Sequence, residues 1–189
     1  MAFAFVALGA SLGGLRALRE VLGGLPADFC TPIGVVLHRH KEALELADII
    51  GRATALPVVE VADKTPLGAG RIYLAPADYH MMVEQGHFAL ATDAPVSYAR
   101  PSIDVFFRSV AETFAAQAVG VLLTGANHDG AEGLALIRTY GGCAVVQDPA
   151  GAEAPAMPSA ALAAGPVDHV LPLARIAPLL IELCPSMPR

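Results

Sequence analysis

The sequence has few charged residues and no cluster of basic ones. Lysine, arginine, aspartate and glutamate make up 16% of the 189 residues, and the net charge is -6. A nucleic-acid partner is therefore not expected, because nucleic-acid-binding proteins gather positive charge on one surface. Hydrophobic residues reach 54%, which argues against a disordered chain. We expect a single domain over residues 1–189 with a sizeable buried core.

Cysteine is also scarce. Cys30, Cys143 and Cys184 are odd in number, and no Cys-x-x-Cys pair occurs. Neither a disulfide framework nor a zinc site is predicted, and a reduced, cytoplasmic setting fits best. The start of the chain lacks basic residues, and its apolar run is too short to cross a membrane. We therefore expect a buried strand there, with no signal peptide and no direct membrane insertion.

What the sequence does contain is an alternation of short apolar runs and helical periodicity. This alternation predicts an α/β fold: a doubly wound, mainly parallel sheet covered by helices on both faces. The expected strands are residues 3–8, 33–37, 58–61, 119–123, 143–147 and 169–171. The expected helices are residues 13–22, 41–54, 102–116, 131–140, 159–164 and 173–183.

The middle of the chain departs from this alternation. Three strand-like runs, residues 71–75, 80–84 and 87–92, follow one another without a helix between them. Gln85 and Gly86 form a tight turn between the last two, so these runs predict a small antiparallel hairpin insertion. A proline-containing loop follows, and Ser102 is expected to cap the next helix.

The first strand leads into a Gly-x-Ser-x-Gly pattern formed by Gly9, Ser11 and Gly13. Such a turn between a strand and a helix presents a serine oxygen at the edge of a sheet. The helix that follows offers unpaired N–H groups to an oxyanion. Glycine-rich turns of this kind also serve packing or phosphate binding, so the pattern alone leaves the chemistry open.

Two further polar residues follow other predicted strands. His38 comes after the second strand, and Asp129 lies in the segment after the strand at residues 119–123. Ligands of open parallel sheets gather at the carboxyl ends of the strands, so the three side chains are expected near one another. In that arrangement His38 can take the Ser11 proton and Asp129 can orient the imidazole. Asp129 can also be the N-cap of the helix that follows it.

An ordered set of motifs runs through the chain, at residues 9–15, 35–38, 72–76, 79–81, 100–104, 122–125, 129–134, 147–148 and 157–158. From about residue 5 to residue 176, this set resembles the CheB family of chemotaxis protein-glutamate methylesterases. The resemblance implies a catalytic triad of Ser11, His38 and Asp129 and no cofactor. It implies hydrolysis of glutamyl methyl esters on the cytoplasmic domains of methyl-accepting chemoreceptors, often with deamidation of receptor glutamines, and contacts with other chemosensory proteins.

The same resemblance extends to the surroundings of the serine. Backbone groups near Leu12, Gly13, Ala126 and Asn127 are expected to hold the oxyanion. Substrate contacts are expected from His80, Arg100 and Met157. Arg100 can instead belong to a helix cap, and Met157 can instead begin a helix.

The sequence also departs from the family. Leu37 and the pair Arg39-His40 flank the histidine where the family usually has glutamine and Met-Pro, and Ala126-Asn127 replaces Met-Gly before the aspartate. We expect Asn127 to tolerate left-handed backbone angles there. Family members often carry an N-terminal phosphoreceiver domain, whereas this sequence starts at the catalytic strand, so phosphorylation in cis is not expected.

Three alternatives remain open from the residues. The first is a catalytically silent adaptor of the same fold, suggested by the altered loop at residues 126–127. The second is a dinucleotide-binding module, although Ser11 occupies the second glycine position of Gly-x-Gly-x-x-Gly. The third is a metal hydrolase, although no compact ligand motif supports it. Its metal ligands would be His38, His40, His80 and Asp129.

Overall fold

The described part of the chain, residues 3–38 and 45–185 of a computed structural model, is built around one parallel sheet. Within it, seven strands lie in the order β3-β4-β2-β1-β7-β8-β9, and all neighbouring pairs are parallel. A separate antiparallel pair is formed by β5 and β6. The strands are β1 (Phe5–Ala10), β2 (Ile33–Leu37), β3 (Val58–Glu60), β4 (Ile72–Leu74), β5 (His80–Glu84), β6 (His87–Ala91), β7 (Ala118–Leu122), β8 (Cys143–Gln147) and β9 (His169–Leu171).

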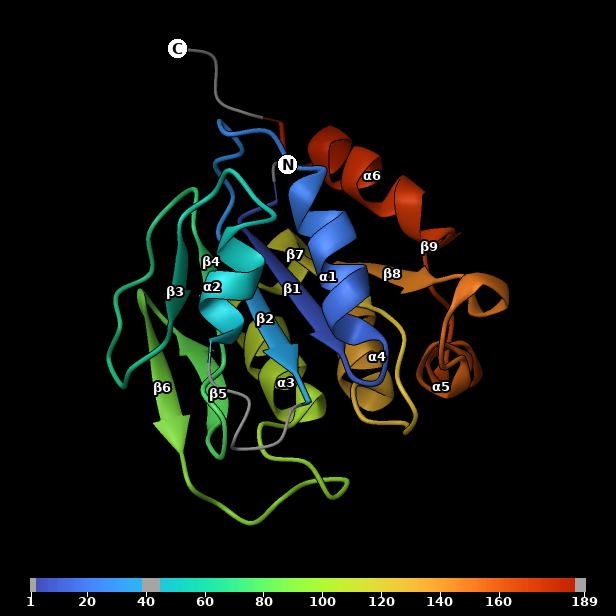
Figure 1. Ribbon diagram of the computed structural model, residues 1–189. Coiled ribbons are helices and arrows are strands. Elements are labelled where there is room, and N and C mark those ends of the chain that lie inside the picture. The colour runs from blue at the N-terminus through green and yellow to red at the C-terminus, as the bar shows by residue number, and fades with distance from the viewer. Residues whose placement is uncertain (1–2, 39–44, 186–189) are drawn as a thin grey trace.

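Helices cover both faces of this sheet (Figure 1). One face packs against α1, α2 and α6, and the other packs against α3, α4, α5 and the β5–β6 hairpin. The predicted doubly wound fold with a small antiparallel hairpin is confirmed. The helices are α1 (Gly14–Gly23), α2 (Leu46–Gly51), α3 (Ile103–Phe114), α4 (Ala131–Thr139), α5 (Ala156–Ala164) and α6 (Ile176–Leu183), with short 3-10 helices at Ala115–Gln117, Pro149–Gly151 and Leu173–Arg175.

The central strand β1 shows why the sheet needs cover on both sides. All six of its residues are buried, and they alternate between the two hydrophobic clusters. Val6 and Leu8 pack toward α1, whereas Phe5 and Ala7 pack toward α3. A strand buried on both faces reads as a continuous apolar run, which is how it could be recognised in the sequence.

One part of the hairpin prediction is wrong. Residues 71–75 were expected in the antiparallel insertion, but β4 lies in the main sheet between β2 and β3. Its three residues are fully buried there. A short apolar run fits a parallel or an antiparallel neighbour equally well, so its local pattern does not reveal its partner.

Several predicted boundaries also shift. The first strand is β1, Phe5–Ala10, and not residues 3–8, because its ladder to β2 continues to Ala10. Helix α5 begins at Ala156, so Met157 lies in its first turn and not in a loop. The predicted helix over residues 173–183 divides into a 3-10 helix and α6. Part of the predicted helix at 41–54 lies outside the described residues; within them α2 spans Leu46–Gly51.

The strand order places a topological switch point at β1. This strand lies between β2 and β7. The chain first adds β2, β3 and β4 on one side of β1 and later adds β7, β8 and β9 on the other side. Open parallel sheets bind ligands at the carboxyl end of such a point. Among the described helices, none is long and apolar enough to cross a membrane.

Candidate functional site

The turn after β1 presents Ser11 at the carboxyl edge of the sheet. Gly13 is the N-cap of α1 and has a left-handed φ of 76°. A residue with a side chain adopts this φ only with strain. The carboxyl group of Glu153 lies against Gly13, so the position has no room for a Cβ either. Leu12 is 58% exposed. The turn therefore has the open geometry expected of a nucleophile elbow.

Backbone bonds to Thr124 brace this turn. The Ser11 N–H donates to the Thr124 carbonyl over 3.0 Å, and the Thr124 hydroxyl donates to the Leu12 carbonyl over 3.0 Å. Thr124 is 2% exposed, and its own N–H donates to the side chain of Gln147. Among the described residues, the Ser11 hydroxyl itself has no hydrogen-bond partner. Hydrogen bonds therefore hold the main chain of Ser11, whereas its hydroxyl oxygen has none within the described residues.

His38 follows β2 directly beside this turn. The register pairs Ala10 with Leu37, and the His38 N–H donates to the Ala10 carbonyl over 3.0 Å. Ser11 and His38 thus directly follow the last residues of β1 and β2, two neighbouring strands that are hydrogen-bonded to each other. The side chain of His38 is 14% exposed, and its Nε2 contacts Oδ2 of Asp129 at 2.8 Å. The other ring nitrogen of His38, Nδ1, has no hydrogen-bond partner among the described residues.

The Asp129 carboxylate accepts three further hydrogen bonds besides the one from His38. The Ser102 hydroxyl and the Asp104 N–H donate to Oδ1 over 2.8 and 3.0 Å. The Ile103 N–H donates to Oδ2 over 2.7 Å. Asp129 is completely buried, so these bonds replace all of its contact with water. Neither Ser102 nor Ile103 was predicted as part of the site.

The structure contradicts the alternative in which Asp129 caps the helix that follows it. Gly130 is the N-cap of α4, and no side chain caps that helix. The carboxylate instead receives the N–H groups at the start of α3, which begins a few Å away because Ile103 packs against Gly9 and Gly130. A Cβ on either glycine would collide with the Ile103 side chain. The unpaired N–H groups of a helix start are well suited to a carboxylate.

Two neighbouring carboxyl groups at this helix start have opposite electrostatics. Burial alone would raise the pKa of Asp129, but the hydrogen bonds from His38, Ile103, Asp104 and Ser102 outweigh it and hold that pKa below the ordinary value. Burial raises the pKa of Asp104 to about 6, and the charge of Asp129 adds to this rise. Asp129 is therefore ionised at neutral pH, as a residue that orients an imidazolium must be.

The backbone N–H groups of all four residues predicted to hold the oxyanion have no hydrogen-bond partner among the described residues. Leu12 and Gly13 belong to the turn after β1, and Ala126 and Asn127 belong to the loop after β7. Asn127 does not take the left-handed angles expected of it. Its side-chain oxygen instead accepts the Asp129 N–H over 3.3 Å. The altered loop therefore keeps both an available donor and a fixed shape.

Three predicted substrate contacts have other contacts in the structure. Met157 is fully buried and packs on Gly125, where it supports the loop before Ala126. His80 is 2% exposed and both of its ring nitrogens are hydrogen-bonded, to Ser102 and to the Ala94 carbonyl. The Arg100 guanidinium binds the Asp78 carboxylate over 2.7 Å, and it also donates to the carbonyls of Thr92 and Asp93.

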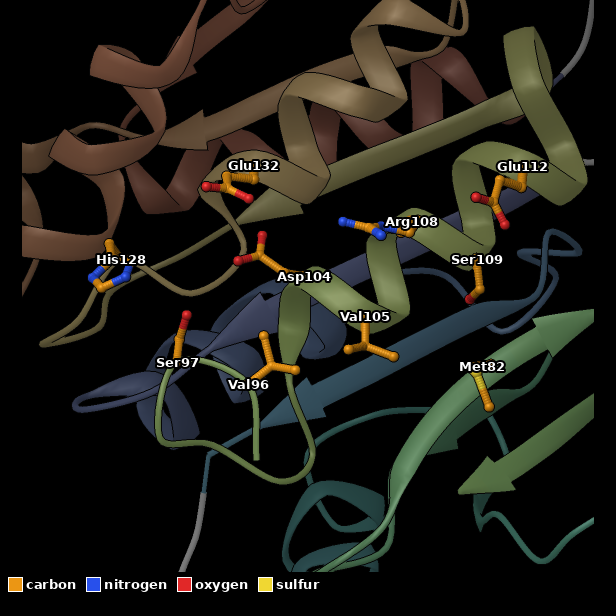
Figure 2. A pocket seen from close by; sticks show the side chains of 10 residues that line it. All are labelled: Met82, Val96, Ser97, Asp104, Val105, Arg108, Ser109, Glu112, His128 and Glu132. Carbon is orange, nitrogen blue, oxygen red and sulfur yellow. The ribbon is translucent and has the colours of Figure 1, made fainter. Parts of the chain in front are cut away.

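A cavity of about 310 Å³ lies apart from the Ser11 site. It lies on the outer side of α3 and α4 and is lined by none of Ser11, His38 and Asp129. Figure 2 shows Asp104 and Arg108 projecting from α3 toward Glu132 of α4. The buried carboxyl of Asp104 accepts the Gly133 N–H over 2.7 Å, so it ties α3 to α4 behind the Asp129 network.

The metal hydrolase alternative finds no support in the described residues. No group of three or more histidine, cysteine, aspartate and glutamate side chains there could hold a metal ion. His40, one of the proposed ligands, lies outside the described residues, together with Arg39.

Comparisons with known proteins identify a family for the chain as a whole. The family model described as CheB methylesterase matches residues 6–180. A relative from Leptospira interrogans, by name a provisional protein-glutamate methylesterase/protein-glutamine glutaminase, is 39% identical over 185 residues, or 97% of this chain and 96% of its own length. A protein-glutamate methylesterase/protein-glutamine glutaminase 1 from Cupriavidus pinatubonensis is 42% identical over 184 residues, or 96% of this chain.

The chain spans only 54% of the Cupriavidus protein, so relatives of two lengths share this part. Among solved structures, the catalytic domain of the CheB methylesterase of Thermotoga maritima superposes with a TM-score of 0.91. It is 31% identical, and the match covers 97% of this chain and all of the solved domain. A sheet order, a helix arrangement and a sequence that agree over nearly the whole length leave one conclusion: the chain belongs to the CheB methylesterase family.

Proposed function

We propose that this chain hydrolyses glutamyl methyl esters on the cytoplasmic domains of chemoreceptors, with Ser11 as its nucleophile. One observation carries the proposal: the imidazole of His38, beside Ser11 on the neighbouring strand, is bonded at 2.8 Å to a fully buried carboxylate. A histidine held in this way can accept the proton of a neighbouring hydroxyl and be stabilised while it carries that proton.

The hydrogen bond between His38 and Asp129 supports a role for Nδ1 of His38 as the base. Nε2 of His38 donates to Asp129, so Nδ1 carries the lone pair that takes the Ser11 proton. In the standard arrangement the aspartate binds Nδ1 and the serine faces Nε2, so the ring is used here in the opposite sense. The strand register favours this use of Nδ1, because Ser11 and His38 follow the paired residues Ala10 and Leu37 and therefore lie at the same level along the two strands.

The reaction has two steps. Ser11 Oγ attacks the ester carbonyl, and the N–H groups of Leu12 and Ala126 hold the oxyanion. His38 then returns the proton to the leaving oxygen, so that methanol departs and a glutamyl ester of Ser11 remains. Water, deprotonated by His38, hydrolyses that ester. Each oxyanion donor of this kind contributes roughly 3 kcal/mol to the transition state.

A glutamine side chain can enter the same sequence, with ammonia leaving in place of methanol. Two relatives described above carry both activities in their names. The adaptor alternative rested on the loop at residues 126–127. Within the described residues the N–H of Ala126 has no partner, and together with the side-chain hydrogen bond of Asn127 this favours an active site over a silent one.

The test is methanol release from chemoreceptors methylated with a labelled methyl group. The wild-type chain should release labelled methanol, and Ser11→Ala should not. Release by Ser11→Ala at a rate near that of the wild type would refute the nucleophile assignment. Release by neither protein, with the receptors shown to be methylated, would refute the proposed substrate.

A further inference from the structure

The start of α3 supplies most of the hydrogen bonds to the Asp129 carboxylate. Three of its four donors come from this one helix start, at 2.7 to 3.0 Å. Nothing in α4, the helix that follows Asp129, binds its carboxylate. The orientation of Asp129, and thus which oxygen meets His38, is set by a segment more than 20 residues away in the sequence.

Ser102 has two roles in this arrangement. Its hydroxyl accepts the Val105 N–H over 3.3 Å, which makes it the N-cap of α3. A hydroxyl has one proton, and that proton is directed at Oδ1 of Asp129 over 2.8 Å. Ser102 is completely buried, so no water can take over either bond. The helix cap and the link to Asp129 therefore depend on the same oxygen.

His80 binds the backbone N–H of Ser102. Its Nδ1 accepts the Ser102 N–H over 3.2 Å, and its Nε2 lies 3.1 Å from the Ala94 carbonyl. A backbone N–H can only donate and a carbonyl can only accept, so the ring carries its proton on Nε2. His80 thereby uses both nitrogens to fix the main chain at Ser102.

We propose that Ser102 is a positioning residue for the esterase reaction: its hydroxyl holds Asp129 so that Oδ2 stays on Nε2 of His38, and His80 holds Ser102. The effect on rate rests on the proposed function, whereas the effect on the His38 hydrogen bond does not. In metal sites, loss of a residue that orients a ligating histidine typically costs about 10- to 100-fold in affinity or activity, and we expect a similar range here.

Two variants of Ser102 separate positioning from capping. Glycine is a well-tolerated N-cap, so Ser102→Gly removes the donor to Asp129 and keeps the helix start. Ser102→Thr keeps the hydroxyl. With methylated receptor as substrate, we expect kcat of Ser102→Gly to fall about 10- to 100-fold while KM changes by less than about 3-fold. Ser102→Thr should recover most of kcat. Equal kcat in wild type and Ser102→Gly would overturn the proposal.

Proton NMR gives a readout that needs no activity. The proton on Nε2 of His38 is bonded to a buried carboxylate, so it should give a resolved low-field resonance, assigned by its absence in His38→Gln. We expect this resonance in the wild type and Ser102→Thr, and its loss or broadening in Ser102→Gly. Its retention in Ser102→Gly would show that Ser102 only caps the helix. An inactive wild type that follows the expected NMR pattern would refute the substrate and leave the positioning role supported.

A second pair of variants decides the question if Ser102→Gly does not fold. His80→Asn offers a side-chain oxygen to the Ser102 N–H, whereas His80→Leu offers none. The proposal expects the His38 resonance and kcat to survive in His80→Asn and to be reduced in His80→Leu. Equal behaviour of the two variants would contradict it.

Discussion

Ser11 and Asp129, the two ends of the proposed triad, are held in opposite ways. The Ser11 turn is fixed through its backbone by Thr124, and its hydroxyl has no partner among the described residues. The Asp129 side chain is fully buried and accepts bonds from His38, Ser102, Ile103 and Asp104. The difference fits the proposed roles of the two residues: the Asp129 charge is already held in place in the folded protein, and the Ser11 hydroxyl has no hydrogen bond to break before it reacts.

Stability and activity should therefore respond differently at the two ends. The loss of the Ser11 hydroxyl removes no hydrogen bond between described residues, so we expect it to affect the reaction and not the stability. The loss of a buried, fully bonded carboxylate leaves several donors unsatisfied, so it affects the reaction and the fold together. Four substitutions test this contrast, in order of expected effect.

Ser11→Ala should cause the largest loss. We expect esterase activity to fall by at least about 10⁴-fold, because a lone nucleophile deletion costs nearly as much as deletion of a whole triad. The free energy of unfolding should change by less than about 0.5 kcal/mol. Methanol release and urea unfolding measure the two effects. Ser159→Ala, at an exposed serine of α5, is the matched control and should alter neither. A clear loss of stability in Ser11→Ala would contradict the contrast.

Asp129→Asn should damage both properties. We expect kcat to fall about 10³- to 10⁴-fold and unfolding at pH 7 to become easier by about 2 to 4 kcal/mol. The lowered pKa of Asp129 gives stability that is present above the unfolded-state pKa of about 3.9 and is lost as the pH falls through the folded-state pKa. The gap between wild type and variant should thus narrow below about pH 4 in urea titrations. Equal stability at pH 7 would contradict the role of the bonds to α3.

Asp104→Asn should have the opposite effect on stability. Because the pKa of Asp104 is raised to about 6, the wild type loses stability as the pH rises through that value. The variant keeps the oxygen that accepts the Gly133 N–H, and it should be more stable at pH 8 by up to about 3 kcal/mol. Below about pH 4 the gain should disappear. A gain at pH 4, or none at pH 8, would show that burial does not penalise this carboxylate.

Arg100→Gln should have the smallest effect. The Arg100 side chain is 22% exposed and pairs with a partly exposed Asp78, so its loss should cost about 1 kcal/mol or less. If Arg100 only holds its loop, KM for methylated receptor should change by less than about 3-fold. A rise in KM of about 10-fold or more, with stability unchanged, would make Arg100 a substrate contact.

The positions of the proposed triad residues could be predicted from the sequence, but the hydrogen bonds that hold Asp129 could not. The positions of Ser11, His38 and Asp129 at strand exits follow from apolar runs and from the rule that parallel strands end at one edge. The bonds between Asp129 and α3 could not be predicted, because they join residues 25 to 27 positions apart with no local pattern. Ser102 was predicted only as a helix cap, since capping is a local property and the second use of its hydroxyl is not.

The same limit explains the error at residues 71–75. The burial of β4 was visible as an apolar run, but its place between β2 and β3 depends on strands distant in the chain. Local periodicity predicts an element, whereas its neighbours are decided by packing of the whole sheet.

Covalent labelling with a fluorophosphonate tests the proposed chemistry most directly. This reagent reacts with serines activated by a neighbouring base, and peptide mapping by mass spectrometry locates the adduct. We predict one adduct on Ser11 of the wild type, none in Ser11→Ala, and much slower labelling in His38→Gln. An unlabelled wild type, or an adduct that persists in Ser11→Ala, would contradict Ser11 as the activated nucleophile.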